Sequence, residues 1–241
     1  KLDMDGLGDY DRNSGYVNGD VVMTNETVTF NYDRGRKFSI DSMDNEETAG
    51  LAFGKLAAEF IRTKVIPEQD AFRFATYANL AGAKVSGTLL TGADVLEALQ
   101  TAISVMDDAE VPSENRHLFI IPALLVAAQN VDTNKSRDIL GAFASITKVP
   151  GARFYTAIDL LDGKTGGEEK GGFKKATAGK DINFLIIEKS AVLQYTKHNV
   201  SKAIPPEDNP DADAWIFNFR EYGLADVYEN KTAGIYLHHK A

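Results

Sequence analysis

The chain has 241 residues, of which 44% are hydrophobic and 25% charged, so it is long enough to bury a sizeable core. It has no cysteine, which excludes disulfides, cysteine-ligated zinc and thiol nucleophiles. Its net charge of -9 argues against a protein that binds nucleic acid tightly through the phosphates. The charge is compatible with a protein surface that lies beside nucleic acid without binding it tightly.

The start of the chain shows neither an initiator Met nor an apolar leader. Because it begins Lys1-Leu2-Asp3, we expect that a stretch before Lys1 is processed, disordered or left out. No apolar run approaches the roughly 18 residues of a membrane span, so we expect no membrane association.

The first 37 residues are polar, rich in glycine and dense in Asp, Asn, Tyr and Arg. Residues 21–32 alternate in the manner of a strand, residues 33–36 predict a turn, and the alternation resumes over residues 37–41. This pattern predicts a long, exposed β-hairpin arm. Such an arm cannot bury enough surface to be stable alone and needs a neighbour.

A long helix is predicted next. Asp44 or Asn45 can cap it, and Pro67 should end or kink it near Ile66 before a second helical stretch over residues 68–80. Together they predict a bent helix of about thirty residues, long enough to act as a spine. Its apolar stripe comprises Ala49, Ala52, Phe53, Leu56, Ala57, Phe60 and Ile61.

Residues 88–199 mix helices and strands. Thr91 and Asp94 form a capping box before an amphipathic helix, and residues 117–121 are a short strand after which Pro122 begins a helix. Residues 182–187 predict a buried strand with residues 191–195 as its partner, whereas the Gly- and Lys-rich residues 162–180 predict a mobile loop.

The last part of the sequence predicts a closing β-meander. Residues 205–210 hold three prolines and predict a rigid turn. Three strands are then expected, over residues 215–219, 224–228 and 235–237.

The order of these elements resembles that of the major capsid proteins of tailed phages with the Hong Kong 97-type fold. It is similar to one branch of coat proteins from phages and prophages of Gram-positive bacteria. Each motif is weak alone, but their order and spacing make the match fairly specific over nearly the whole chain. The motifs are YDRNSGY at residues 10–16, DRGRKFSID at 33–41, VIPEQDAFRFA at 65–75 and TAGIYL at 232–237.

The resemblance implies an α+β fold with an E-loop hairpin, a P-domain with a long spine helix and β-strands, and a mixed α/β A-domain. Its boundaries on this chain are as follows: residues 1–4 start a P-domain strand, 5–37 form the E-loop, 38–87 form the P-domain with the spine helix, 88–199 form the A-domain, and 200–241 form the P-domain return strands.

The function that the resemblance implies is that of a major capsid protein, which is not an enzyme and assembles with itself into pentamers and hexamers of an icosahedral head. The head encloses DNA without sequence-specific binding, is assembled in the bacterial host cytoplasm and becomes part of the virion. Scaffolding, portal or decoration proteins are the other partners to expect. Some members crosslink an E-loop lysine to a neighbour's asparagine, but no lysine lies between Lys1 and Lys37, so we infer a shell without that bond.

The arm also holds the residues that we expect at a subunit interface. Tyrosines offer large contact area at low entropic cost, and arginines can fork onto carboxylates. The predicted interface residues are Tyr10, Arg12, Tyr16, Tyr32, Arg34 and Arg36.

Chemical motifs support no catalytic, cofactor or metal site. Asp9, Asp11, Asn13 and Asp20 fit a calcium-loop spacing, but Ser14 stands where that loop needs glycine. Residues 163–165 end like a phosphate-binding loop, yet residue 158 is Ile158 rather than glycine. The four histidines do not place two imidazoles on one helix face.

Two alternatives remain open. An encapsulin-like nanocompartment shell would share the fold but package a protein cargo. A monomeric α/β binding module or enzyme would be a compact single subunit with convergent polar groups at one site, and the long polar arm argues against it.

Overall fold

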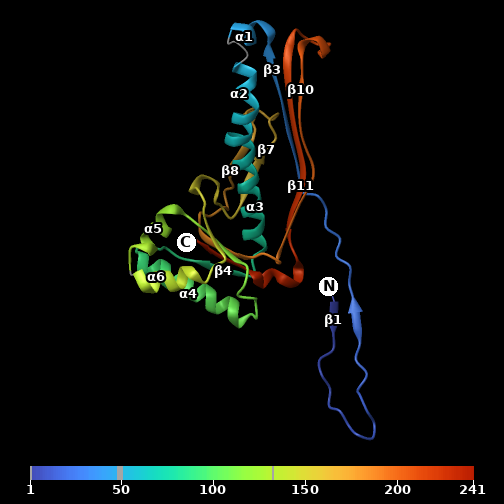
Figure 1. The fold of residues 1–241 in the computed structure, drawn as a ribbon, viewed down its shortest axis with the longest axis vertical. Coiled ribbons are helices and arrows are strands. Elements are labelled where there is room, and N and C mark those ends of the chain that lie inside the picture. Colours follow the sequence, from blue (N-terminus) through green and yellow to red (C-terminus); the bar gives the residue numbers. More distant parts are fainter. Residues whose placement is uncertain (1, 48–50, 132) are drawn as a thin grey trace.

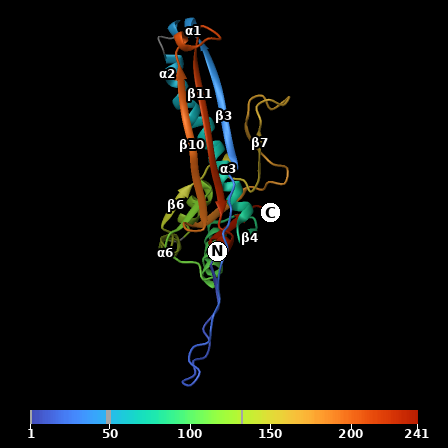
Figure 2. The same cartoon turned by 90° about the vertical axis from the view of Figure 1, so that its right-hand side faces the viewer.

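The computed structural model describes residues 2–47, 51–131 and 133–241. A thin N-terminal arm projects from one end of a long body, and a compact mixed unit of helices and strands lies beside the lower half of that body (Figure 1). The view turned by 90° shows the same arrangement, with the arm running beyond the end of the body (Figure 2).

The arm is a narrow hairpin. β1 (Leu2–Met4) pairs antiparallel with β2 (Val21–Met23), with Leu2 opposite Met23. Residues 24–31, which link β2 to the body, have no strand geometry. The strand predicted over residues 21–32 is therefore wrong for its middle, because a strand requires a hydrogen-bonded neighbour and the β1–β2 ladder ends at Met23.

The body contains a long antiparallel sheet of three strands. β11 (Ala214–Val227) is central, flanked by β3 (Tyr32–Asp41) and β10 (Val192–Ile204). Phe217 and Phe219, on alternate positions of β11, face the helix that covers one side of this sheet. We refer to β3, β10 and β11 as the long sheet.

The covering helix runs through three segments after the short α1 (Ser42–Glu47). α2 (Leu51–Phe60) continues through a π-helical turn, η1 (Ile61–Val65), into α3 (Ile66–Leu80). The helix does not end at Pro67 as the sequence allowed, since Val65 and Ile66 keep helical backbone angles. A wider π-helical turn lies just before this proline, which has no N–H to offer the preceding turn. The side chains of the predicted stripe positions Ala49, Ala52 and Phe53 lie outside the described residues.

An aromatic cluster joins the helix to the long sheet. The ring centroid of Phe60 lies 4.8 Å from that of Phe38 and 5.8 Å from that of Phe219. Val65 and Phe217 are buried in the same cluster. Edge-to-face pairs of this kind stabilise by about 0.5–1.5 kcal/mol each beyond their burial.

The mixed unit has three layers around a sheet in the order β4-β12-β9-β5-β6. One face packs against the end of α3 and the other against three helices. The central β9 is buried throughout, because both faces are covered. The strands are β4 (Ala83–Ser86), β5 (Arg116–Ile120), β6 (Ser145–Lys148), β9 (Ile182–Glu188) and β12 (Ile235–His239), and the helices are α4 (Gly92–Asp108), α5 (Pro122–Gln129) and α6 (Thr133–Gly141).

A second hairpin corrects the prediction of a mobile loop. β7 (Ile158–Leu161), just before the stretch expected to lack structure, pairs with β8 (Gly172–Lys175), which lies inside it. The intervening turn is held by Asp162, whose carboxylate accepts hydrogen bonds from the backbone N–H of Lys164 at 2.7 Å and of Thr165 at 2.8 Å. With the Thr165 hydroxyl, these bonds lower the pKa of Asp162 to about 2. Short 3-10 turns occupy Gly151–Arg153, Pro206–Asp208 and Glu229–Gly234.

The turn predicted at residues 33–36 is also wrong. These residues lie inside β3, where Gly35 is opposite Arg220 of β11. A Cβ atom on Gly35 would lie 2.8 Å from the carbonyl oxygen of Phe219. The glycine therefore permits close approach of two strands rather than a reversal of the chain.

The predicted closing meander is wrong in two respects. The strands expected at residues 215–219 and 224–228 are one strand, because Gly223 remains in the ladder opposite Thr196 and Tyr32. The last strand, β12, leaves the long sheet and pairs with β4 and β9. For the same reason residues 191–195 are not the partner of β9, since β10 pairs with β11.

Several local predictions are confirmed. Thr91 and Asp94 form the capping box of α4, and Pro122 stands in the first turn of α5. The buried strand at residues 182–187 is β9, and the Pro206–Asp208 turn connects β10 to β11. These elements depend on local chemistry, which a sequence records directly.

Replacing Gly92 with Ala should destabilise the mixed unit. A Cβ atom on Gly92 would lie 2.1 Å from the carbonyl oxygen of Ala127 in α5, so α4 and α5 would have to separate. Such overpacking costs about 1–3 kcal/mol, measurable by urea unfolding. Gly141→Ala is the control, because nothing lies within 4 Å of its added Cβ. Equal stability of the two variants would contradict the close helix packing.

Candidate subunit interface

The tip of the arm is a preformed turn. The Asp11 carboxylate accepts hydrogen bonds from the backbone N–H of Asn13 at 2.7 Å and of Ser14 at 3.0 Å, which lowers the pKa of Asp11. Gly15 takes a φ of +80°, which favours glycine, and bonds back to Asp11. The ring centroids of Tyr10 and Tyr16 then lie 5.0 Å apart, presented together at the tip.

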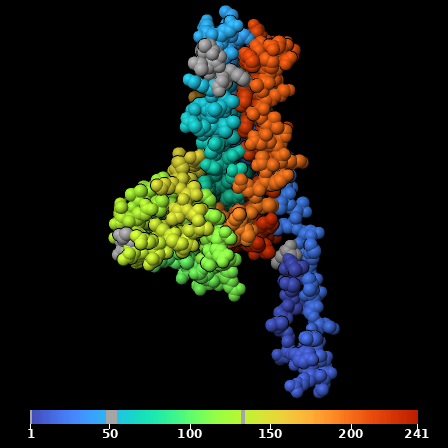
Figure 3. Space-filling view, viewed as in Figure 1, coloured from blue at the N-terminus to red at the C-terminus, as the bar shows by residue number. Residues whose placement is uncertain are grey.

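The rest of the arm exposes apolar side chains. The space-filling view shows a narrow projection with no other part of the chain against its far end (Figure 3). Tyr16 is 87% exposed and Leu7 is fully exposed. Exposed apolar side chains gathered on one projection are typical of an interaction surface. The exposed members are Leu2, Met4, Leu7, Tyr10, Tyr16, Val17, Val21, Val22 and Met23.

The root of the arm is fastened to the long sheet. The side-chain amide of Asn31 donates to the carbonyl oxygen of Ala225 at 2.8 Å, and its oxygen accepts from the Ala225 N–H at 3.1 Å. Phe30 stacks on Tyr222 with ring centroids 4.8 Å apart, and the ammonium group of Lys197 lies 5.4 Å from the centroid of the Phe30 ring. The arm therefore leaves the body at a fixed point.

A buried carboxylate holds the beginning of β3 to the helix. Glu68 accepts hydrogen bonds from the Arg34 guanidinium at 2.6 Å and from the Tyr32 hydroxyl at 3.3 Å. Tyr32 is buried, and burial together with the nearby carboxylates Glu68 and Glu221 raises its pKa. Tyr32 and Arg34 therefore have hydrogen-bond partners within their own subunit.

Arginines of β3 also hold the second hairpin. Arg34 donates to the carbonyl oxygens of Leu161 at 2.8 Å and Gly172 at 3.2 Å, which lie opposite each other where the two hairpin strands meet the turn. Arg36 donates to the carbonyl oxygen of Glu169 at 3.0 Å, near the hairpin tip. Guanidinium groups suit this task because their donors are fixed in a planar fork.

A second buried carboxylate, Glu221, lies beside this network. It accepts a hydrogen bond from the Gln69 side chain, and its oxygen lies 4.0 Å from the Arg73 guanidinium. Burial raises the pKa of Glu221, opposed by the charge of Arg73 and reinforced by that of Glu68. The folded chain therefore holds this ionised group at a cost.

The six predicted interface residues divide into two groups. Tyr10, Arg12 and Tyr16 are brought together at the exposed arm tip. Tyr32, Arg34 and Arg36 lie on β3 with partners in their own chain, so their role between subunits stays a prediction.

Three residues at the root were not predicted. Glu68 and Glu221 had a detectable signal, since each is a charge at a position that its element's pattern assigns to the buried side. Glu221 follows Phe217 and Phe219 at the same spacing of two along β11. Asn31 had none, because its two hydrogen bonds depend on a residue far along the chain.

The described residues contain no other obvious chemical site. Across residues 2–47, 51–131 and 133–241, no group of three or more His, Asp or Glu side chains is placed to hold a metal ion. Within the same ranges, no helix is both long and apolar enough to cross a membrane.

Comparison with known proteins places the fold. No family model and no curated protein matches the sequence. The capsid structure of cyanophage P-SCSP1u has a TM-score of 0.62 at 13% identity, covering 100% of this chain and 84% of that chain. A protein of Mycobacterium phage Che8 has a TM-score of 0.60 at 12% identity, covering 99% and 82%. The chain has a phage capsid fold.

The capsid fold is the α+β, Hong Kong 97-type architecture that the sequence predicted. It is shared beyond phages, since the virus-like particle of Pyrococcus furiosus matches with a TM-score of 0.54 at 9% identity, covering 98% and 86%. At these identities the likeness establishes the fold, and the function must be argued from the surfaces.

Replacing Glu221 with Gln should raise the free energy of unfolding at pH 7. Because the folded pKa is raised, the proton on Glu221 stabilises the folded chain at low pH, and this contribution is lost as the pH rises through the folded pKa. The difference between variant and wild type should therefore shrink below about pH 4, where folded and unfolded states both hold the proton. Urea unfolding of both proteins at pH 7 and below pH 4 measures this difference in the free energy of unfolding.

The control is Glu59→Gln, since the Arg62 guanidinium lowers the pKa of this exposed carboxyl. That variant should gain no stability at pH 7. A Glu221→Gln variant less stable than wild type at pH 7 would show that the Gln69 and Arg73 contacts outweigh the cost of burial.

Proposed function

We propose that this chain is the major capsid protein of a tailed bacteriophage or prophage, which assembles with copies of itself into the pentamers and hexamers of an icosahedral head. The capsid fold supports this proposal over the full length of the chain. The observation that carries it is the arm, which is shaped and rigidly rooted yet buries almost nothing within its own subunit.

The arm serves assembly, because only a contact outside its own subunit can offset the entropy cost of ordering it. Holding a residue in one backbone conformation costs about 1–2 kcal/mol, and the arm has no core of its own to offset this. A neighbouring subunit supplies the missing surface. Each contact can be modest, because a closed shell repeats it in every subunit.

The parts of the subunit then take the roles that the family resemblance implies. The arm over residues 2–31 acts as the E-loop, and the long sheet with α2 and α3 acts as the P-domain. The mixed unit acts as the A-domain, with β12 belonging to it rather than to the P-domain. These limits differ from the predicted boundaries at residues 37 and 200. The whole of β3 pairs in the long sheet, and β12 pairs in the sheet of the mixed unit.

The finer features of the proposal concern the particle. The head encloses DNA without sequence-specific binding, forms in the bacterial host cytoplasm and needs no catalytic step from this chain. Scaffolding, portal or decoration proteins complete it, and the branch is that of phages of Gram-positive bacteria. The absence of lysine between Lys1 and Lys37 supports a shell that is not covalently crosslinked through the arm.

A nanocompartment shell is the second candidate. The match to the virus-like particle of Pyrococcus furiosus favours it, since a virus-like particle shares this fold. Its lower TM-score, 0.54 against 0.62 for the cyanophage capsid, makes the phage head the preferred proposal.

The first test is assembly of the full-length protein, with any residues that precede Lys1 included. Light scattering and negative-stain microscopy should show closed shells, or free pentamers and hexamers. Shells with nucleic acid of phage-head diameter support the phage proposal, whereas smaller shells with a protein cargo support a nanocompartment. A strict monomer at high concentration, with scaffold supplied, would contradict both.

The arm-tip tyrosines should matter for assembly and not for folding. The double variant Tyr10→Ser, Tyr16→Ser should lose most particles, because an anchoring aromatic at an interface contributes about 2 kcal/mol or more. Its thermal unfolding should match wild type, since both rings are exposed. Tyr10→Phe with Tyr16→Phe is the matched control and should still assemble. Normal particles from the serine variant would contradict a role for the tip.

A further inference from the structure

The arm contains a chemically reactive pair of residues that the proposed function does not use. Asn18 is followed by Gly19, and no other asparagine in the sequence is followed by glycine. The backbone nitrogen after an asparagine can attack the asparagine side chain and close a five-membered ring. Glycine favours this step, because it has no Cβ to crowd its own nitrogen and its backbone turns freely.

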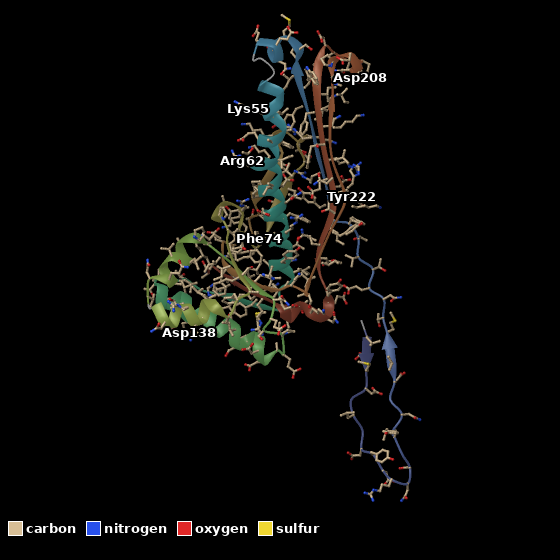
Figure 4. All side chains as sticks on the ribbon, in the orientation of Figure 1. Lys55, Arg62, Phe74, Asp138, Asp208 and Tyr222 are labelled. Atoms are coloured by element: carbon tan, nitrogen blue, oxygen red, sulfur yellow. The ribbon has the colours of Figure 1, made fainter. Side chains whose placement is uncertain are left out.

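This pair is exposed on the second limb of the hairpin. Asn18 and Gly19 are both open to solvent. The first limb opposite them reads Gly-Leu-Gly over residues 6–8, so two of its three positions have no side chain that covers the amide. Figure 4 shows the side chains of the arm projecting beyond Tyr222, apart from those of the body. Water and hydroxide therefore reach the pair.

The reacting groups are also free of hydrogen bonds. In the part of the arm that the structure describes, neither the Asn18 side chain nor the Gly19 N–H takes part in one. The chain is fixed on either side of them. The Gly15 N–H donates to the Asp11 carbonyl oxygen at 2.8 Å, and the Asp20 N–H donates to the Asp5 carboxylate at 2.8 Å. Asn18 and Gly19 lie in the span between these two contacts.

Asn13, in the same arm, provides the contrast. It is exposed as well, and the residue after it is Ser14. The Ser14 N–H donates to the Asp11 carboxylate at 3.0 Å. The nitrogen that would attack the Asn13 side chain is therefore held, and the adjacent negative charge opposes the loss of its proton. Breaking a hydrogen bond to a charged group slows such a step by about tenfold or more.

The reaction of the pair consumes only solvent water. The Gly19 nitrogen loses its proton to hydroxide and attacks the side-chain carbonyl carbon of Asn18. A C–N bond forms, the bond to the side-chain amino group breaks, and ammonia leaves. Water then opens the succinimide ring. Opening at the side-chain carbonyl gives aspartate, and opening at the backbone carbonyl gives isoaspartate, in which the main chain runs through the former side chain.

The two products affect the arm differently. Isoaspartate adds one backbone atom, about 1.5 Å of chain, to the second limb alone. This atom lies between the turn at Asp11 and Gly15 and the contact of Asp20 with Asp5, so the tip must move relative to the first limb. Aspartate only adds one negative charge to an arm that already has six acidic residues over residues 2–31.

We propose that Asn18 is a self-modification site of the free chain, which converts to aspartate and isoaspartate through ring closure with Gly19. The isoaspartate product then excludes the subunit from assembly, which limits the time for which a free subunit stays competent. The first step follows from the arm alone, and the second rests on the proposed function.

Peptide mapping by mass spectrometry tests the first step on the full-length, unassembled protein at mildly alkaline pH. Asn18 should convert about tenfold or more faster than Asn13, whose attacking nitrogen is held. An isoaspartyl methyltransferase should label the same peptide. The rate should rise with the hydroxide concentration, because the Gly19 nitrogen must lose a proton. Equal rates at Asn18 and Asn13, or no conversion at Asn18, would overturn the proposal.

Two glycine substitutions provide matched variants. Gly19→Ala should slow the conversion by about tenfold or more, because the methyl group displaces the attacking nitrogen from its path. The fold accepts this methyl group, since the added Cβ would lie 3.6 Å from the Cβ atom of Asp5. Gly6→Ala has nothing within 4 Å of its added Cβ and should convert like the wild type. Equal rates in the two variants would contradict ring closure through Gly19.

A competition experiment measures the second step. Aged protein, which contains both unmodified and isoaspartate chains, is allowed to assemble, and the isoaspartate fraction is compared between particles and free subunits. Particles should be depleted in isoaspartate by about tenfold or more, since a displaced tip loses its aromatic anchors. Fresh Asn18→Asp protein gains the charge without the added atom and should assemble like the wild type. Equal isoaspartate fractions in particles and free subunits would contradict this step.

The outcomes separate this inference from the proposed function. Assembly of a chain that shows no conversion at Asn18 would overturn the inference and leave the capsid proposal standing. Conversion at Asn18 in a chain that never assembles would confirm the first step, contradict the capsid proposal and overturn the second step with it.

Discussion

The buried carboxylate of Glu68 is the interaction on which the other parts of this subunit depend. It stands in the first turn of α3 and accepts hydrogen bonds from Arg34 and Tyr32 of β3. Through Arg34 the same group reaches the second hairpin at Leu161 and Gly172. One charge thus ties the helix, the long sheet, the hairpin and the root of the arm, and removing it would leave a half-buried guanidinium without its main partner.

This network sits directly after the π-helical turn and Pro67, where the helix is least regular. A helix that widens at one turn can change direction there, while the ion pair holds its next turn to the sheet. Glu221 and Gln69 add a second polar contact at the same level. The polar contacts hold α3 to the long sheet just after the irregular turn. A change of direction of α2 before that turn therefore need not disturb the root of the arm.

The sequence predicted those features whose cause is local. The capping box of Thr91 and Asp94, the helix start at Pro122 and the buried run of β9 follow from neighbours in the chain, and all are present. The sequence-based prediction failed where pairing with a strand far along the chain determines the local structure. Gly35 and Gly223 read as chain reversals, yet each lets a neighbouring strand approach closely.

The residues predicted at a subunit interface show the same division. Tyr10, Arg12 and Tyr16 occupy a turn that the sequence encodes within seven residues, and the structure places them together at the tip. The fork of donors on Arg34 predicts a carboxylate partner, and that partner is Glu68 in the same chain. A sequence shows that an arginine needs a carboxylate, and only the fold shows which one.

The arm presents a physical problem that one subunit does not solve. An isolated hairpin without a core is marginal in water. The contacts of Asn31 at the root direct the arm away from the long sheet of its own subunit (Figure 1). Under the proposed function the surface that stabilises the arm lies on a neighbouring copy, and a closed shell gives every copy such a neighbour.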